Sequence, residues 1–68
     1  MVNVELLDEA IEKSGLKRKY IAQEMGLTVH TFNNKAKNRS NFKDVEIPKL
    51  CKILKITDRK KRDAIFLL

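Results

Sequence analysis

Two short apolar segments separated by a glycine constrain this chain more than any other feature of its sequence. Ile21 and Met25 fall on one face of a helix, and the apolar spacing breaks at Gly26 before it resumes. Glycine readily adopts the positive φ that ends a helix and turns the chain. The pattern predicts two short helices, over residues 17–25 and 29–37, joined by a tight turn.

The second of these segments has an apolar edge and a polar face. At about 100° per residue, Phe32 points away from the polar side chains, and we expect Val29 and Ala36 to flank it on the buried side. Thr28 can cap the start of the helix. Asparagine can bond two edges of adenine at once, and lysine or histidine can donate to guanine or phosphate, although a functionless solvated face would look similar. The polar face consists of His30, Asn33, Asn34 and Lys37.

One further helix precedes the pair. Val4, Leu7 and Ile11 repeat at helical spacing, and the acids of the first turns suit the positive end of the helix dipole. Asn3 is a good residue to cap its start, and Gly15 is a good residue to stop it. We therefore expect a helix between Asn3 and Gly15 that serves as a scaffold.

Another helix follows the pair after a loop rich in turn-forming and basic residues. Phe42 is expected to anchor that loop in the core. The start of the helix is open: Asp44 could cap it, or it could begin at Ile47 with Pro48 as its first fully helical residue. Its apolar stripe repeats at i, i+3, i+4 and i+7 and consists of Ile47, Leu50, Cys51 and Leu54.

A last helix is expected after Asp58, which can cap it. In its final turns Ala64, Ile65 and Leu68 could cover the core, which would leave Phe66 and Leu67 on other sides. Such an apolar end could contact a partner or fold back on the domain. The sequence thus predicts an all-α fold: a single domain over residues 1–68, built as a compact bundle of about five short helices.

Size and cysteine content narrow the possibilities. A chain of 68 residues with one cysteine forms no internal disulfide, and no Cys/His cluster offers a metal site. We expect Cys51 to be a buried structural thiol, since it lies in an apolar stripe. No segment resembles a membrane span or a secretion signal, so we expect a cytoplasmic protein.

The net charge of +6 is unevenly distributed. Four of the nine acids lie in the first twelve residues, whereas fourteen of the fifteen Lys and Arg residues follow Gly15. This segregation predicts one acidic face and one broad basic surface that could bind a polyanion, or that could simply solubilise the domain. His30 is the sole histidine, and there is no Gly-rich phosphate loop, so we expect neither enzymatic activity nor a cofactor.

The paired helices have a recognisable arrangement of residues. The chain resembles the lambda-repressor-like, Cro/repressor (XRE-type) helix-turn-helix domain in its Ile21-Ala22, Met25-Gly26-Leu27, Thr28 and Phe32 positions. Residues 32–56 and the Ala64-Ile65-Phe66 end are similar to small regulators of Gram-positive phages and prophages. Two positions depart from the family pattern: Lys35 replaces an apolar residue, and Lys43 replaces the Ser or Thr that begins a capping box.

The resemblance implies roles for particular residues. Base edges in the major groove would be read by Val29, His30, Thr31 and Asn34. Contacts to the DNA backbone would come from Lys17, Arg18, Lys19, Asn33, Lys37, Arg39 and Lys43. At the apolar end, the candidate dimer contacts are Ile65, Phe66, Leu67 and Leu68.

Two functional hypotheses follow. The first is a sequence-specific, double-stranded-DNA-binding transcriptional regulator of phage or prophage type, which occludes its operator as a homodimer in the cytosol of a bacterial host, near the nucleoid. The second is a protein–protein interaction module, an antirepressor or antitoxin-like partner of another regulator, that uses exposed Phe66 and Leu67. Neither hypothesis involves a membrane.

Overall fold

The first helix, α1 (Val4–Ser14), begins and ends where the sequence predicts. In the computed structural model, which describes all 68 residues, the Leu6 N–H donates to Asn3 Oδ1 at 3.1 Å and caps the helix. Gly15 follows with a φ of 72°, a left-handed conformation that suits glycine. Both signals were local ones, and both are confirmed.

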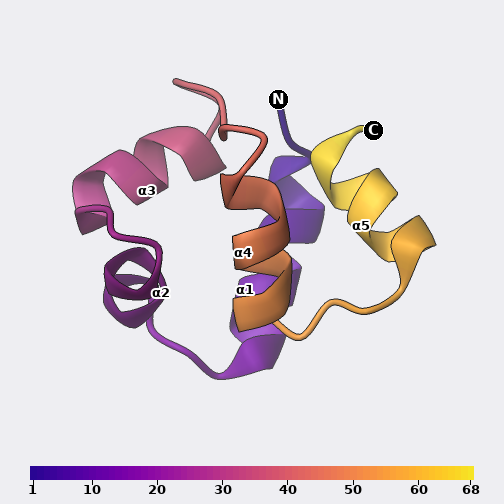
Figure 1. Ribbon diagram of the computed structural model, residues 1–68, viewed down its shortest axis with the longest axis horizontal. Coiled ribbons are helices and arrows are strands. Elements are labelled where there is room, and N and C mark those ends of the chain that lie inside the picture. The colour runs from indigo at the N-terminus through magenta and orange to yellow at the C-terminus, as the bar shows by residue number, and fades with distance from the viewer.

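Helices α2 (Arg18–Glu24) and α3 (Val29–Ala36) lie within one residue of their predicted bounds at each end. Thr28 caps α3 as expected, because its hydroxyl oxygen accepts the N–H of Thr31 at 3.1 Å. The two helices pack against each other, and so the predicted helix-turn-helix arrangement is present in the structure (Figure 1).

The turn between α2 and α3 depends on Gly26, whose φ is 72°. The Gly26 N–H donates to the carbonyl of Gln23 at 3.0 Å, and the Leu27 N–H donates to the carbonyl of Ala22 at 2.8 Å. These two bonds are those of a Schellman motif, which satisfies carbonyls at the end of a helix. The left-handed glycine thus both ends α2 and directs the chain into α3.

Helix α4 (Glu46–Ile53) begins in neither of the ways expected. Asp44 provides no side-chain cap, and Pro48 is the third helical residue. The proline is tolerated there because the first N–H groups of a helix have no intrahelical partner. Part of a capping box is present although Lys43 replaces its Ser or Thr. Glu46 Oε1 accepts the backbone N–H of Lys43 at 2.8 Å, which is one of the two hydrogen bonds of that motif.

Helix α5 (Arg59–Phe66) is capped by Asp58, as predicted, but its apolar end was assigned wrongly. Phe66 is buried, with 3% of its surface exposed, whereas Ala64 and Leu68 are exposed. The helical wheel assumed that the helix continued to the last residue. Instead Leu67 adopts a left-handed conformation with a φ of 56°, so the chain leaves the helix before Leu68.

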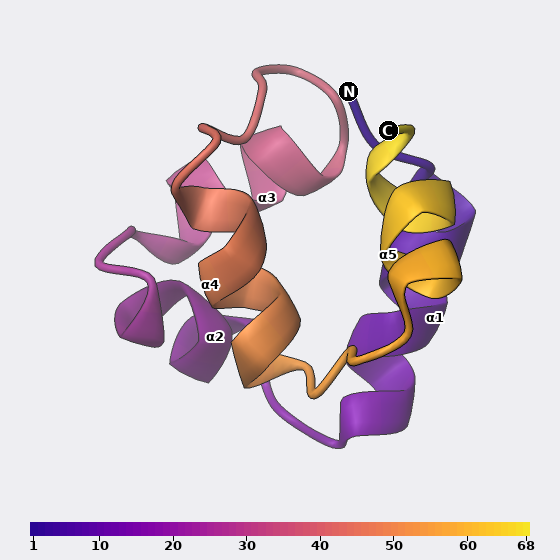
Figure 2. The ribbon, with the colours of Figure 1, turned by 45° about the vertical axis from the view of Figure 1, so that its right-hand side comes forward.

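The helices surround a single apolar core. In Figure 1, helix α4 lies in front of α1, with α2 and α3 on one side and α5 on the other. The turned view of Figure 2 separates α4 from α1 and shows α5 beside α1, the helix that it contacts. Phe42 anchors its loop as predicted: its ring meets those of Phe32 and Phe66 edge to face, with centroids 6.1 and 6.0 Å apart. These three rings link α3, the following loop and α5. Cys51 is buried in α4, and burial raises the pKa of its thiol.

The N-terminal residues are held by two elements distant in sequence. Asn38, directly after α3, accepts the Val2 N–H at 2.8 Å and donates its amide N–H to the Val2 carbonyl at 2.9 Å. The Asn3 N–H donates to the carbonyl of Ile65 in α5 at 2.7 Å. The first residues thereby join the end of α3 to the end of α5. None of the five helices has the length and apolar character needed to span a bilayer.

Candidate nucleic-acid interface

Helix α3 presents the polar face that the sequence predicts. Phe32 and Ala36 are completely buried, which fixes the rotation of the helix on the core. On its other side His30 and Lys37 are exposed. Three further side chains are half-buried: Thr31, Asn33 and Asn34. The structure therefore brings the predicted base-reading residues together on one helix.

Val29 is the exception to the predicted orientation. It was expected to flank Phe32 on the buried side, but 42% of its surface is exposed. As the first residue of α3 it precedes the turn that packs against the core. An exposed valine at this position has methyl groups free to meet an apolar feature such as a thymine methyl.

His30 and Asn34 are linked one turn apart. The Asn34 Nδ2 atom lies 3.3 Å from His30 Nε2. An amide nitrogen can only donate, so a hydrogen bond between these two atoms has Asn34 as its donor. Asn34 keeps its carbonyl oxygen and a second amide hydrogen for another partner. The pair thus offers both an acceptor and a donor to a base edge.

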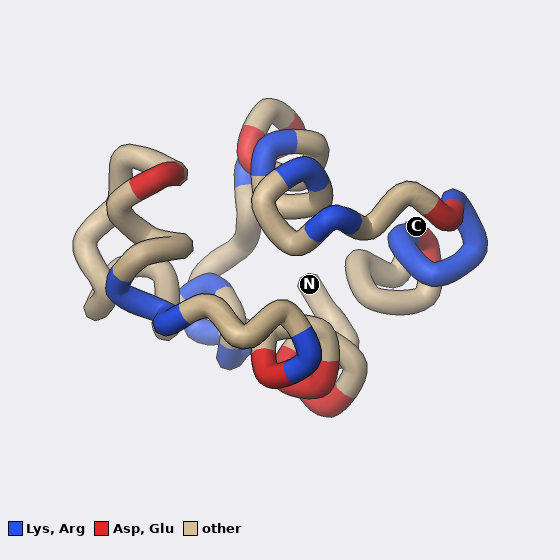
Figure 3. Tube along the Cα trace, turned by 90° about the horizontal axis from the view of Figure 1, so that it is seen from below, with Lys and Arg blue, Asp and Glu red and all other residues tan.

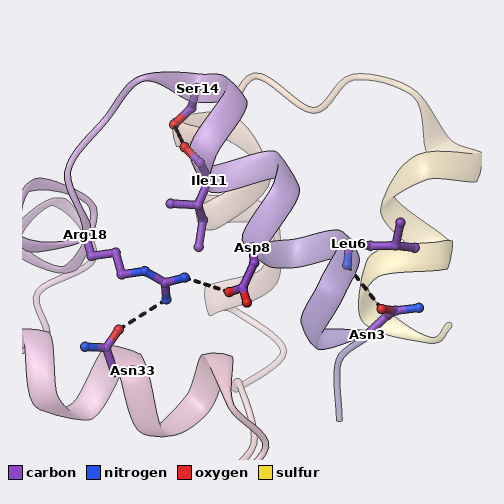
Figure 4. Close-up of polar contacts among 7 residues, drawn as sticks. All are labelled: Asn3, Leu6, Asp8, Ile11, Ser14, Arg18 and Asn33. Carbon is purple, nitrogen blue, oxygen red and sulfur yellow. Dashed lines mark hydrogen bonds and ion pairs between the residues drawn. The ribbon is translucent and has the colours of Figure 1, made fainter.

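Arg18 has a more complicated position than a simple phosphate contact (Figure 4). Its Nη2 atom donates to Asp8 Oδ1 on α1 at 2.6 Å, and its Nη1 atom donates to Asn33 Oδ1 on α3 at 3.2 Å. The guanidinium therefore ties the first turn of α2 to both neighbouring helices. Asp8 was not predictable as a partner, since it lies ten residues from Arg18 and no local pattern joins the two.

The remaining predicted backbone contacts are exposed cations. The four ion pairs of the structure involve only Lys13, Arg18, Lys35 and Arg62 among the basic residues. Five exposed side chains are thus left without an acidic partner, and each can approach an anion without breaking an existing bond. They are Lys17, Lys19, Lys37, Arg39 and Lys43.

Charge is distributed over several elements (Figure 3). The acids of the first twelve residues all lie on α1 or directly at its first turn. Basic positions recur at the start of α2, along α4 and at the start of α5. The acidic face expected from the sequence is therefore α1, whereas the basic residues do not share one helix face.

The candidate dimer contacts separate into two groups. Ile65 and Phe66 belong to the core and are unavailable to a partner. Leu67 and Leu68 are exposed, and they line a surface pocket of about 340 Å³ together with Met1. No group of His, Cys, Asp and Glu side chains in the structure is arranged to hold a metal ion.

Comparison with protein-family models, with curated proteins and with solved structures finds no match for this chain.

Proposed function

We propose that this chain is a sequence-specific, double-stranded-DNA-binding transcriptional regulator of the Cro/repressor type found in phages and prophages. The observation that carries the proposal is the orientation of α3: its apolar edge is locked in the core, and His30 and Asn34 stand together on its outer face. An α-helix with such a face fits the major groove of B-DNA. The proposed function includes no catalytic step.

The surroundings of α3 support the same proposal. Lys17 and Lys19 flank the start of α2, and Lys37 and Arg39 follow α3, all of them exposed and without acidic partners. Cations beside a reading helix neutralise the phosphates on both sides of the groove. Bound in this way, a domain of this size would act by occluding its operator. Leu67 and Leu68 remain the candidate contacts of a homodimer that reads two half-sites.

The interaction-module hypothesis loses one of its two contacts. It relied on Phe66 and Leu67 as exposed side chains; Phe66 is in the core, whereas 58% of the surface of Leu67 is exposed. Substitution of Phe66 by serine would unfold the domain instead of testing a partner surface, because a buried aromatic side chain contributes about 3–5 kcal/mol.

Selection of bound sequences from a random duplex pool is the first test. We expect enrichment of a short motif, repeated in inverted orientation if the protein binds as a dimer. On the selected duplex, log affinity should fall against log salt with a slope of about 0.9 for each phosphate contacted. A pool without enrichment, together with no duplex binding at low salt, would contradict the proposal.

A pair of asparagine variants tests the role of α3. Asn34→Ala removes a side chain from the proposed reading face, and Asn41→Ala makes the same chemical change in an exposed loop. One bidentate base contact contributes about 1–3 kcal/mol of discrimination, so Asn34→Ala should weaken specific binding about tenfold or more. Asn41→Ala should change it less than about twofold. Equal effects of the two variants would exclude α3 as the reading helix.

A further inference from the structure

A groove of about 570 Å³ lies between α2 and α4, apart from the outer face of α3. Leu16, Tyr20 and Ile53 form its apolar part, and we call it the α2–α4 groove. Tyr20 is 48% exposed, and Leu16 and Ile53 are half-buried. The groove thus leaves an aromatic ring and two aliphatic side chains partly open to solvent.

The rim of the groove is basic. Lys49, Lys52 and Lys55 line it from α4 and from the residues directly after α4, and all three are exposed. None of them takes part in an ion pair. Glu24 is the single acid of the lining, which leaves a net charge of +2 around the apolar part.

We propose that the α2–α4 groove binds an acidic amphipathic segment of another protein. Apolar side chains of such a segment would cover Tyr20 and Ile53, and its carboxylates would meet the three lysines. A site that combines an exposed tyrosine with a cationic rim has the composition of a strong binding site. Tyrosine is enriched among the residues that contribute most to binding energy, and complementary charge steers the encounter of the two partners. An amphipathic helix laid in a groove is a common form of such recognition.

DNA is a poorer fit to the same groove. A duplex presents phosphates at its surface and is contacted mainly by polar and basic groups that protrude from the protein. The lysines would suit phosphates, but Leu16, Tyr20 and Ile53 would gain nothing from them. Apolar area at the base of a concave site favours a partner that brings apolar side chains of its own.

The proposal does not depend on DNA binding by α3, so it can be tested on the free protein. The probe is a capped, fluorescein-labelled peptide of about 14 residues, with leucine at i, i+3, i+4 and i+7, about four glutamates beside this stripe and alanine at the other positions, which favours a helix. A second peptide has the same composition in scrambled order. Binding is measured by fluorescence anisotropy, and the contact residues are mapped from amide chemical shifts with unlabelled peptide.

We expect the ordered peptide to bind and to shift the amide signals of residues 16–24 and 49–55, with the scrambled peptide at least about fivefold weaker because its apolar stripe is lost. Tyr20→Ala should weaken binding about tenfold. Lys52→Glu should weaken it by a similar factor, whereas the matched reversal Lys60→Glu, on the exposed start of α5, should change it less than about twofold. All three positions are exposed, and thermal unfolding verifies that the variants remain folded.

Three results would overturn the proposal. The first is no saturable binding at about 1 mM peptide, which corresponds to a free energy weaker than about −4 kcal/mol. The second is an equal loss with Lys52→Glu and Lys60→Glu, which would mean attraction by net charge alone. The third is that Tyr20→Ala reduces affinity for the selected duplex as much as Asn34→Ala does, which would make the groove part of the DNA-binding surface.

Discussion

The ammonium group of Lys35, on the inner side of α3, lies 2.6 Å from Glu46 Oε1 at the start of α4. Only 8% of the surface of Lys35 and 9% of that of Glu46 are exposed. The same carboxylate oxygen accepts the N–H of Lys43, so one acid connects the end of the proposed reading helix to the first turn of α4. Lys35, which stands where the family pattern has an apolar residue, thus ends on a buried partner.

This ion pair makes a prediction about stability. Glu46→Gln keeps an oxygen for the Lys43 N–H but leaves the buried ammonium of Lys35 without a counter-charge. Breaking a buried pair in this way costs about 3 kcal/mol. Glu24→Gln makes the same change at an exposed acid that forms no ion pair, and should cost less than about 0.5 kcal/mol. Urea unfolding measures both values.

A double variant shows whether Glu46→Gln lowers stability through the broken ion pair or through loss of packing. Lys35→Met in the Glu46→Gln background removes the stranded charge and retains an unbranched side chain, so it should recover most of the lost stability. If it adds a further loss instead, the unpaired charge of Lys35 is not the cause of the loss in Glu46→Gln.

The pH dependence of stability follows from the same carboxylate. Burial opposes the charged form of Glu46, but the hydrogen bonds from Lys35 and from the Lys43 N–H, with the charges of both lysines, outweigh it and lower the pKa from 4.5. A lowered folded-state pKa contributes stability above the unfolded value, and that stability is lost as pH falls through the folded-state value.

The measurement is the difference in unfolding free energy between the native chain and Glu46→Gln across pH. It should be constant above about pH 5.5 and shrink below 4.5, because a protonated Glu46 resembles glutamine. A difference that stayed constant down to about pH 2.5 would show that folding does not lower the pKa of Glu46.

Local signals explain why much of the fold was predictable. Asn3, Gly15, Gly26, Thr28 and Asp58 each act on backbone groups within a few residues, and all five perform the predicted task. The polar face of α3 was likewise predictable, since the position of one large side chain in a short helix determines the others.

The errors arose where distant residues decide the outcome. No local pattern shows that Lys35 ends at Glu46 or that Arg18 meets Asp8, because each of these contacts forms only when two separate helices pack together. Phe66 was misplaced because contacts such as that with the Phe42 ring set the rotation of α5 on the core, and Leu68 was misplaced because the left-handed Leu67 ends the helix.

A second residue in the left-handed conformation, Lys55, leads to a prediction in which two glycine substitutions change stability in opposite directions. Lys55 has a φ of 56° and occupies the position after α4 where glycine is usual: the Ile56 N–H donates to the Cys51 carbonyl at 2.8 Å across it. Lys55→Gly should relieve the backbone and stabilise the domain by about 0.5 kcal/mol. Lys49→Gly, the same substitution inside α4, should destabilise it by about 1 kcal/mol. Two losses of equal size would contradict the left-handed conformation of Lys55.

The bond between Asp8 and Arg18 makes a prediction about the proposed DNA binding. Asp8 holds one end of a guanidinium that lies beside Asn33, so its carboxylate competes with any phosphate that approaches Arg18. Asp8→Asn should therefore raise duplex affinity about threefold at low salt, and the gain should shrink at higher salt. Its cost in stability should be below about 1 kcal/mol, since both side chains are partly exposed.

Asp63→Asn is the matched control, because Asp63 pairs with Arg62 at 3.0 Å on α5, and its side chain is partly exposed, as that of Asp8 is. It removes the same charge and the same kind of ion pair without touching α2 or α3. We expect its duplex affinity to rise less than about 1.5-fold, by net charge alone. A similar rise in both variants would show that Asp8 acts only through net charge. A fall in affinity for Asp8→Asn would show instead that Asp8 holds Arg18 in its DNA-binding position.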